Sequence, residues 1–271
     1  MKQTKNFSEQ VVVITGASGN LGTELCLAFG QRGAKIVCLD ISQAGLAHLS
    51  ALLTEKQIIH FTSFLDVAQN TDNERIVEKI IQHFGRLDIW VNNAGITHIQ
   101  RFTNIQQPLE VLERVMRVNF FGAVQPLTAA LPHLIQQKGQ IINISSAAGF
   151  APLVGRTAYS ASKHALHGFF ESLREELKAQ GVHVLMVCPS FIGQSASAYQ
   201  DPNHAQAIHQ PKKILGSLVL PQVLAEKITA AATARQNLLI AGRTAWLSYW
   251  LSRLFPNWYA KIMRQRLEGE G

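Results

Sequence analysis

Short apolar runs rich in β-branched residues alternate along the chain with longer segments of helical period. Most of these runs are apolar throughout, which is typical of parallel strands that helices cover on both faces. The runs predict strands at Val11–Thr15, Lys35–Asp40, Ile58–Phe64, Leu87–Asn92, Gly139–Ser145, Val182–Cys188 and Asn237–Ala241. The segments between them predict helices at Gly22–Arg32, Gln43–Leu53, Asn73–Phe84, Leu109–Leu134, Ala158–Gln180 and Pro221–Arg235.

Repeated strand–helix–strand units with right-handed crossovers build a doubly wound α/β fold, here around a seven-stranded parallel sheet. We expect residues 1–242 to form the main domain and residues 243–271 to add a helical tail to it. Residues 189–220 form the one long irregular stretch in the sequence, and the expected lid lies at about 190–220. Such a stretch after a strand favours a lid over a site rather than a domain boundary.

The composition narrows the class of protein. Hydrophobic residues make up 47% of the 271 residues and charged residues 16%, which supplies a packed core and excludes disorder as the main state. The three cysteines are widely spaced within apolar runs, so we expect no disulfide framework and a reducing, cytoplasmic location. We also expect no secretory signal and, without a stretch of about 18 apolar residues, no membrane span.

A glycine-rich loop, Gly16-Ala17-Ser18-Gly19-Asn20-Leu21-Gly22, follows the first strand and opens a helix. Glycines there allow a tight turn and bring backbone amides close to a pyrophosphate at the helix N-terminus. Asp40 ends the next strand, 18 residues beyond Gly22, and completes the dinucleotide fingerprint of a Rossmann fold. Its carboxylate would bind the ribose hydroxyls and repel a 2′-phosphate, and neither Ile41 nor Ser42 supplies a cation. The loop therefore predicts NAD in preference to NADP.

Several polar residues further along are ordinary when taken singly. Tyr159 and Lys163 are four residues apart in a segment of helical period, so their side chains share one face. Ser146 lies just past a strand, and Asn119 lies within a predicted helix. The run Asn92-Asn93-Ala94-Gly95 follows another strand.

In order and spacing, these pieces resemble the short-chain dehydrogenase/reductase family. The resemblance covers about residues 10–195, with a looser match to Pro221–Gly242. The matching pieces are the Thr15–Gly22 loop, Asp40, Asp66-Val67, Asn92-Asn93-Ala94-Gly95, Asn119, Ser146 and Tyr159-Ser160-Ala161-Ser162-Lys163.

The resemblance implies an NAD(P)-dependent oxidoreductase that interconverts alcohols and carbonyl compounds. It implies Tyr159 as the acid/base and Lys163 as the residue that holds the nicotinamide ribose and lowers the tyrosine pKa. It implies that Ser146 binds the substrate oxygen and that Asn119 holds a water linking Lys163 to solvent. It places Asp66 and Val67 beside the adenine and Asn92, Asn93, Ala94 and Gly95 along the cofactor cleft, and we add Pro189 and Ile192 to the expected cofactor site. It also implies a homodimer or homotetramer, formed through the helices around Leu109–Leu134 and Ala158–Gln180.

The chemistry supports these roles independently. Oxidising an alcohol requires loss of its hydroxyl proton as hydride leaves the carbon, and a phenol with a pKa near 10 is a poor base at neutral pH. Lowering that pKa by about three units needs roughly 4 kcal/mol, which a close buried ammonium and the positive oxidised nicotinamide can supply. Ser146 can donate to the developing oxyanion, while the cofactor performs the hydride step.

Two positions depart from the family pattern. Asn20 stands where the family has a glycine, and we expect the loop to close because asparagine tolerates a left-handed backbone. The glycine spacing instead resembles that of the family's longer, epimerase-type branch. After Pro189 the family usually has a glycine and then a threonine that holds the carboxamide, but this chain has Ser190 and then Gln194. Either Gln194 or Ser195 could take over that contact.

The expected lid is largely apolar, and so is the loop before Tyr159. This composition predicts a hydrophobic secondary alcohol or ketone as substrate, with Phe150 and Phe191 joining Ser146 and Tyr159 in the substrate site. No cluster of Arg or Lys is evident there that could bind a carboxylate or phosphate group of a substrate. Arg156 and Lys212-Lys213 are the exceptions to this. The apolar residues are Phe191, Ile192, Ile214, Leu215, Leu218 and Leu220 in the lid, and Phe150, Leu153 and Val154 in the loop.

The tail combines aromatic, apolar and basic residues. Residues 235–271 hold six basic and two acidic side chains, a surplus of four of the whole chain's +7. A stripe at helical spacing runs through Leu247, Trp250, Leu251, Leu254, Phe255 and Trp258. A helix of this kind, within residues 243–267, either lies in a membrane interface or packs on the domain, the lid or another subunit.

Other functions find less support. His164 and His167 lack an evident third metal ligand, so no metal is expected. A hydrolase would need a Gly-x-Ser-x-Gly elbow, which the sequence lacks, and nucleic-acid binding lacks a dedicated module. Two alternatives stay open: a non-catalytic NAD-binding scaffold at a membrane surface, and an epimerase or dehydratase that retains its NAD.

Overall fold

The computed structural model describes residues 6–69, 72–200 and 218–267, so Lys212, Lys213, Ile214 and Leu215 of the expected lid lie outside the described residues. Seven parallel strands form one sheet in the order β3-β2-β1-β4-β5-β6-β7, which confirms the doubly wound fold. Chain order reverses between β1 and β4, and doubly wound proteins bind ligands at the carboxyl ends of such strands. The strands are β1 (Val11–Thr15), β2 (Lys35–Asp40), β3 (His60–Phe64), β4 (Ile89–Asn92), β5 (Gln140–Ile144), β6 (His183–Pro189) and β7 (Leu238–Ala241).

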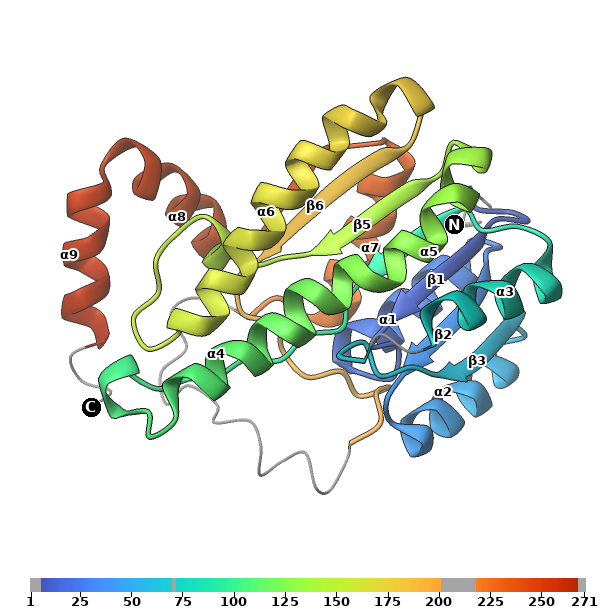
Figure 1. The fold of residues 1–271 in the computed structure, drawn as a ribbon, viewed down its shortest axis with the longest axis horizontal. Coiled ribbons are helices and arrows are strands. Elements are labelled where there is room, and N and C mark those ends of the chain that lie inside the picture. The colour runs from blue at the N-terminus through green and yellow to red at the C-terminus, as the bar shows by residue number, and fades with distance from the viewer. Residues whose placement is uncertain (1–5, 70–71, 201–217, 268–271) are drawn as a thin grey trace.

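Helices cover both faces of the sheet (Figure 1). Successive residues of β1 enter opposite cores: Val12 and Ile14 join one, and Val11 and Val13 join the other. This two-sided burial explains why most of the strands are apolar runs in the sequence. One face carries α1 (Asn20–Gly30), α2 (Gln43–Glu55) and α7 (Pro221–Thr233), and the other carries α3 (Asn73–Phe84), α5 (Gly122–Gln137) and α6 (Thr157–Leu177).

The segment Leu109–Leu134 is helical throughout, as predicted, but a π-helical turn that was not predicted interrupts it. This segment forms α4 (Pro108–Met116), a π-helical turn η2 (Arg117–Phe121) and then α5. The turn carries Asn119, whose side chain accepts a hydrogen bond from the Ile96 amide at 2.8 Å and donates to the Ile96 carbonyl at 2.9 Å. Such a turn inserts one residue without erasing the apolar period, and π-turns are frequent at functional sites.

The tail forms two helices rather than one, α8 (Arg243–Leu254) and α9 (Pro256–Leu267), which lie at one end of the molecule (Figure 1, red). A new helix begins at Pro256 because proline lacks the amide hydrogen that a continued α8 would need. Tyr259 and Met263 of α9 are buried against Ala151, with Leu251 of α8 partly buried beside them. The other members of the expected stripe are exposed: Leu247, Trp250, Leu254, Phe255 and Trp258.

Among the residues that the structure describes, no helix is both long enough and apolar enough to pass through a lipid bilayer.

Candidate active site

The glycine-rich loop is held by close backbone packing. Gly16 has φ +63°, and a Cβ there would lie 2.8 Å from the Cα of Ala94. A Cβ at Gly22 would lie 2.1 Å from the Gly16 carbonyl oxygen, so only glycine fits either position. The Asn93 side-chain amide donates to the carbonyls of Thr15 and Gly16, at 3.0 and 2.9 Å. Hydrogen bonds therefore hold the loop after β1 against the segment after β4, where the strand order of the sheet reverses.

Asp40 lies at the end of β2 and is only 8% exposed. One carboxylate oxygen accepts a hydrogen bond from the Ser18 amide and the other from the Ser42 amide, both at 2.9 Å. The carboxylate thus fixes the glycine-rich loop against β2. Ile41, the next residue, is exposed.

The residues expected beside the adenine lie after β3. Asp66 accepts a hydrogen bond from the Ala68 amide at 2.9 Å and lines a small hollow with Phe64 and Gln69. Val67 is buried against Gly122, where a Cβ would come within 2.8 Å of its side chain.

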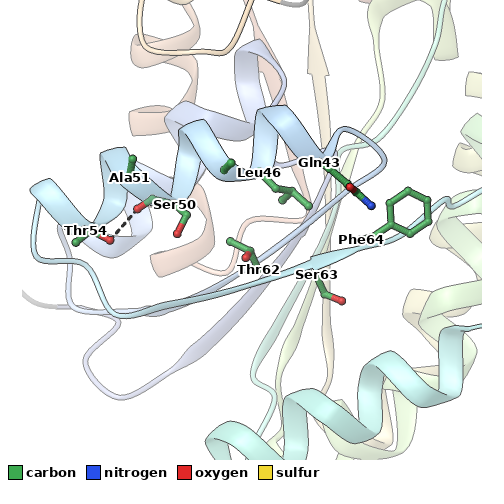
Figure 2. A pocket seen from close by; sticks show the side chains of 9 residues that line it. Gln43, Leu46, Ser50, Ala51, Thr54, Thr62, Ser63 and Phe64 are labelled. Carbon is green, nitrogen blue, oxygen red and sulfur yellow. Dashed lines mark hydrogen bonds between the residues drawn. The ribbon is translucent and has the colours of Figure 1, made fainter.

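A larger open groove lies to the side of this region, between α2 and β3 (Figure 2). Hydroxyl groups of Ser50, Thr54 and Thr62 line it together with Leu46. Gln43 and Phe64 stand at one end, where β3 finishes (Figure 2). None of the expected catalytic residues lines the groove.

Tyr159 and Ser146 meet through their side chains. Tyr159 lies in the first turn of α6, and Ser146 caps the short 3₁₀ turn η3 (Ala147–Gly149) after β5. Ser146 is close enough to the Tyr159 hydroxyl to act on its pKa, which it tends to lower. The Ser146 hydroxyl also accepts from the Ala148 amide at 3.1 Å, which fixes its position.

Lys163 lies one turn further along α6 and is only 5% exposed. Its Nζ donates to the Ile144 carbonyl at 2.8 Å and stands 5.6 Å from the centre of the Tyr159 ring. A Cβ added at Gly95 would lie 3.3 Å from Asn119 Oδ1 and 3.8 Å from Lys163 Nζ. The four expected catalytic side chains are therefore brought together at the carboxyl edge of β4 and β5.

Burial governs the protonation of this cluster. It raises the pKa of Tyr159 above its ordinary value, against the lowering effects of the Ser146 hydrogen bond and the Arg156 charge. It lowers the pKa of Lys163 to about 8. The expected lowering of the tyrosine pKa by Lys163 is thus not found in the protein alone, because the loss of hydration outweighs the favourable interactions.

Ser162 belongs to this cluster, and we did not single it out from the sequence. It is fully buried, accepts a hydrogen bond from Asn119 Nδ2 at 3.0 Å and donates to the Tyr159 carbonyl at 2.8 Å. It therefore ties the π-helical turn to the first turn of α6. The helical period held the signal, because residues 159, 162 and 163 share one face.

The first departure from the family pattern, Asn20, contacts the segment that holds the second. Asn20 Oδ1 accepts a hydrogen bond from the Ser195 amide at 3.2 Å, and the Ser195 hydroxyl donates to Glu24 at 2.5 Å. Gln222 also donates to Glu24, at 3.1 Å. Asn20 is the first residue of α1 and has no positive φ, so the expectation that it takes up a left-handed backbone is wrong. Of the two carboxamide candidates, Gln194 is exposed, whereas the Ser195 hydroxyl is already bonded to Glu24.

Some of the expected substrate and lid residues lie after β6, and another packs against the tail. Phe191 lies under the Arg156 guanidinium, 5.3 Å from it, and Ile192 pairs with Val219 after the buried Pro189. Phe150 instead packs against the tail, with its ring 5.1 Å from that of Tyr249 in α8. Its backbone carbonyl accepts a hydrogen bond from Ser252 at 3.3 Å.

The histidines of α6 are engaged within the protein. His167 bonds to Glu171 at 2.8 Å through one ring nitrogen, and its other ring nitrogen stands 3.5 Å from the Cys188 sulfur. His164 bonds to the Ser160 carbonyl at 2.9 Å. Within the described residues, no cluster of three metal-binding side chains occurs.

Comparison with known proteins agrees with this geometry. The family model for short chain dehydrogenase matches residues 10–204, which include the glycine-rich loop and the whole cluster. The chain belongs to the short-chain dehydrogenase family. The match ends before the two tail helices.

Three similar proteins place the chain within the family. A probable oxidoreductase, EphD, of Mycobacterium tuberculosis is 32% identical over 96% of this chain and 46% of its own length. The 11-beta-hydroxysteroid dehydrogenase 1A of Arabidopsis thaliana is 38% identical over 70% of this chain and 54% of its own. A metagenomic short-chain oxidoreductase solved in complex with NADP is 26% identical, with a TM-score of 0.72 over 88% of this chain and 98% of its own. The chain spans about half the length of the first two relatives.

Proposed function

We propose that this protein is an NAD-dependent oxidoreductase that interconverts apolar secondary alcohols and ketones. One observation carries the proposal: Tyr159, Ser146, Lys163 and Asn119 converge beside Gly95, at the edge where the glycine-rich loop lies. Membership of the short-chain dehydrogenase family supports it.

The residues after β1 and β2 suit a nicotinamide dinucleotide. The backbone closes tightly around Gly16 and Gly22, and α1 opens at Gly19, which has no side chain to cap the helix. Amides at the start of α1 can therefore face a pyrophosphate. Asp40 would hold the adenosine ribose, and Lys163 and Tyr159 the nicotinamide ribose. When bound, the nicotinamide supplies the carbon that accepts or releases hydride.

Tyr159 is proposed to carry the proton of the reaction at its hydroxyl oxygen. In alcohol oxidation the phenolate takes the hydroxyl proton of the substrate, and in reduction the phenol returns it to the carbonyl oxygen. Ser146 donates a hydrogen bond to the same substrate oxygen, which carries negative charge in the transition state. Because Ser146 is itself held by the Ala148 amide, it needs no reorganisation during the reaction.

Lys163 is proposed to stabilise the phenolate. Burial opposes each charge alone, yet it strengthens the attraction between a neighbouring ammonium and phenolate. The active site therefore favours ionised Tyr159 only when positive charges are close, from Lys163, from Arg156 and from oxidised nicotinamide. Asn119 holds Ile96 through both backbone groups and so keeps Gly95 close to Lys163.

The preference for NAD rests on Asp40. Its buried carboxylate would accept hydrogen bonds from the two ribose hydroxyls but would repel a 2′-phosphate. Both carboxylate oxygens are held by backbone amides, so the side chain cannot easily turn away. The metagenomic relative was solved with NADP, which makes the cofactor preference of this chain a point to measure.

The apolar substrate is supported by the apolar residues Leu153 and Val154 in the loop before Tyr159, by Phe191 after β6, and by the relative from Arabidopsis named as a hydroxysteroid dehydrogenase. We also propose a homo-oligomer formed through α4, α5 and α6. Leu109 in α4, Phe121 in η2 and Phe169 in α6 are exposed, and apolar contacts of this kind are typical of subunit interfaces.

The test is a panel of secondary alcohols of increasing apolar size, each assayed with NAD and with NADP through the absorbance of reduced nicotinamide. We expect turnover that increases with apolar size and a kcat/KM at least about tenfold higher with NAD, because the carboxylate repels the extra phosphate. A preference for NADP would refute the Asp40 argument. Firm cofactor binding without turnover would favour a scaffold, and conversion without accumulation of reduced cofactor an epimerase or dehydratase.

A further inference from the structure

Helix α8 turns most of its large apolar side chains toward solvent. At about 100° per residue, four of them and Arg243 fall on one side of the helix. The four are exposed, with accessibilities of 57% for Trp246, 52% for Leu247, 45% for Trp250 and 62% for Leu254. This arrangement is the reverse of a surface helix that packs on a core.

The inward side of α8 carries mainly small or polar residues, together with the partly buried Leu251. Ala245 is fully buried, and the Ser252 hydroxyl bonds to the Phe150 carbonyl at 3.3 Å. Tyr249 packs its ring against Phe150. These contacts attach the helix, so its outward side is not needed to hold it in place.

Two more large apolar residues are exposed in the chain just past the end of α8. Phe255 and Trp258 are 58% and 54% exposed. Six large apolar residues exposed within 13 positions of the chain point to an interaction site rather than ordinary surface variation. We call this surface the aromatic face, and it consists of Trp246, Leu247, Trp250, Leu254, Phe255 and Trp258.

Positive charge accompanies the aromatic face. Residues 243–267 contain five basic residues and no acidic residue. Arg243, Arg253, Lys261 and Arg264 are exposed, and the Arg253 guanidinium stacks on Tyr249 at 3.9 Å. The partner of the aromatic face should therefore be both apolar and negatively charged.

We propose that the aromatic face docks into the interfacial region of an anionic lipid membrane. Tryptophan rings and basic side chains are the residues that anchor proteins at this depth. A second copy of the chain fits less well, because a two-fold dimer through this surface would bring like charges together. The lipid contact does not depend on the proposed redox activity.

The experiment measures binding of the full chain to vesicles of phosphatidylcholine with and without phosphatidylglycerol. We expect binding only with phosphatidylglycerol, weakening as salt rises. The double variant Trp250→Ser/Leu254→Ser should lower binding about tenfold or more, because two apolar anchors are lost. Its matched control, Ile59→Ser/Val223→Ser, removes two exposed apolar residues elsewhere and should bind as the wild type does.

A second pair of variants tests the charge. Arg243→Gln/Lys261→Gln should lower binding about 30-fold, since each of the two cations near an anionic surface contributes on the order of 1 kcal/mol. Arg75→Gln/Lys79→Gln, on the exposed side of α3, should leave it unchanged. If an aromatic-face variant fails to fold, quenching of wild-type tryptophan fluorescence by brominated lipids gives the same information.

Three outcomes would overturn the proposal. They are equal binding to neutral and anionic vesicles, no quenching by brominated anionic lipid, and a dimer that is lost with Trp250→Ser/Leu254→Ser while vesicles are not bound. The last outcome would assign the aromatic face to a second copy of the chain.

Discussion

Helices α6 and α8 both lie at the surface of the domain, and they break the usual amphipathic arrangement in opposite ways. α6 turns polar groups inward, where Lys163 and Ser162 are buried. α8 turns apolar groups outward, where Trp250 and Leu254 are exposed. α3 is the regular case, since its apolar Ile76, Val77 and Ile80 are buried and its charged residues are exposed.

The buried polar groups of α6 and the exposed apolar groups of α8 each lower the stability of the protein, for different reasons. Burying an ammonium requires removing its hydration, and a fold keeps such a group when its chemistry is needed inside. Exposing apolar rings forgoes their burial, and a fold keeps that arrangement when the partner is outside the chain. The buried polar groups of α6 therefore point to catalysis, and the exposed apolar groups of α8 point to binding of a partner.

The largest effect should come from removing the buried charge in α6. Lys163→Met should lower kcat/KM by about 10³-fold, because the phenolate loses its neighbouring ammonium. The same variant should raise the free energy of unfolding at neutral pH. A pKa lowered to about 8 from 10.5 corresponds to about 3 kcal/mol. Loss of the hydrogen bond to the Ile144 carbonyl lowers the free energy of unfolding by about 1 kcal/mol. The variant should therefore be more stable than the wild type by about 2 kcal/mol.

The pH dependence of this gain has a definite sign. Between pH 8 and 10.5 the unfolded chain binds more protons at Lys163 than the native protein does, so native stability rises with pH there. The penalty is fully present below pH 8, and the advantage of Lys163→Met should shrink as the pH approaches 10.5. Urea denaturation of the wild type and of Lys163→Met from pH 7 to about 10.5 measures this difference in stability. Lys79→Met on α3 serves as the surface control. A variant that is less stable than the wild type at pH 7 would contradict the account.

A smaller effect is expected when an aromatic ring is removed from α8 than when one is removed from the buried side of α6. Trp250→Ala should change the free energy of unfolding by less than about 0.5 kcal/mol, because the ring lies outside the packed core. Phe170→Ala, on the buried side of α6, should cost about 3 to 5 kcal/mol. Thermal and urea unfolding of both variants give the comparison. A large loss at Trp250 would mean that the aromatic face packs within the chain.

Much of the fold could be predicted because its signals are local. The helix Asn73–Phe84 and the strands Val11–Thr15 and Lys35–Asp40 have the predicted bounds, since apolar runs or amphipathic period mark them directly. The π-helical turn at Asn119 was missed because one inserted residue hardly disturbs the period. The break at Pro256 had a signal that was passed over, because proline rarely continues a helix.

The site was predictable in its residue types but not in its contacts. Spacing places Tyr159, Ser162 and Lys163 on one face, yet it does not say that burial raises the pKa of Tyr159. The bond between Asn20 and Ser195 joins residues 175 positions apart, which no local pattern can reveal. Likewise, the period of α8 indicates an apolar side but not whether that side faces the core or solvent.

The most direct test of the central claim is Tyr159→Phe, which removes only the hydroxyl that is proposed to carry the proton. Turnover of the best alcohol found in the panel and cofactor affinity should be measured side by side. We predict a loss of at least about 10³-fold in kcat, because the acid/base group is gone, with cofactor affinity within a few-fold of the wild type. Turnover retained within about tenfold would contradict the mechanism, because another group would then be moving the proton.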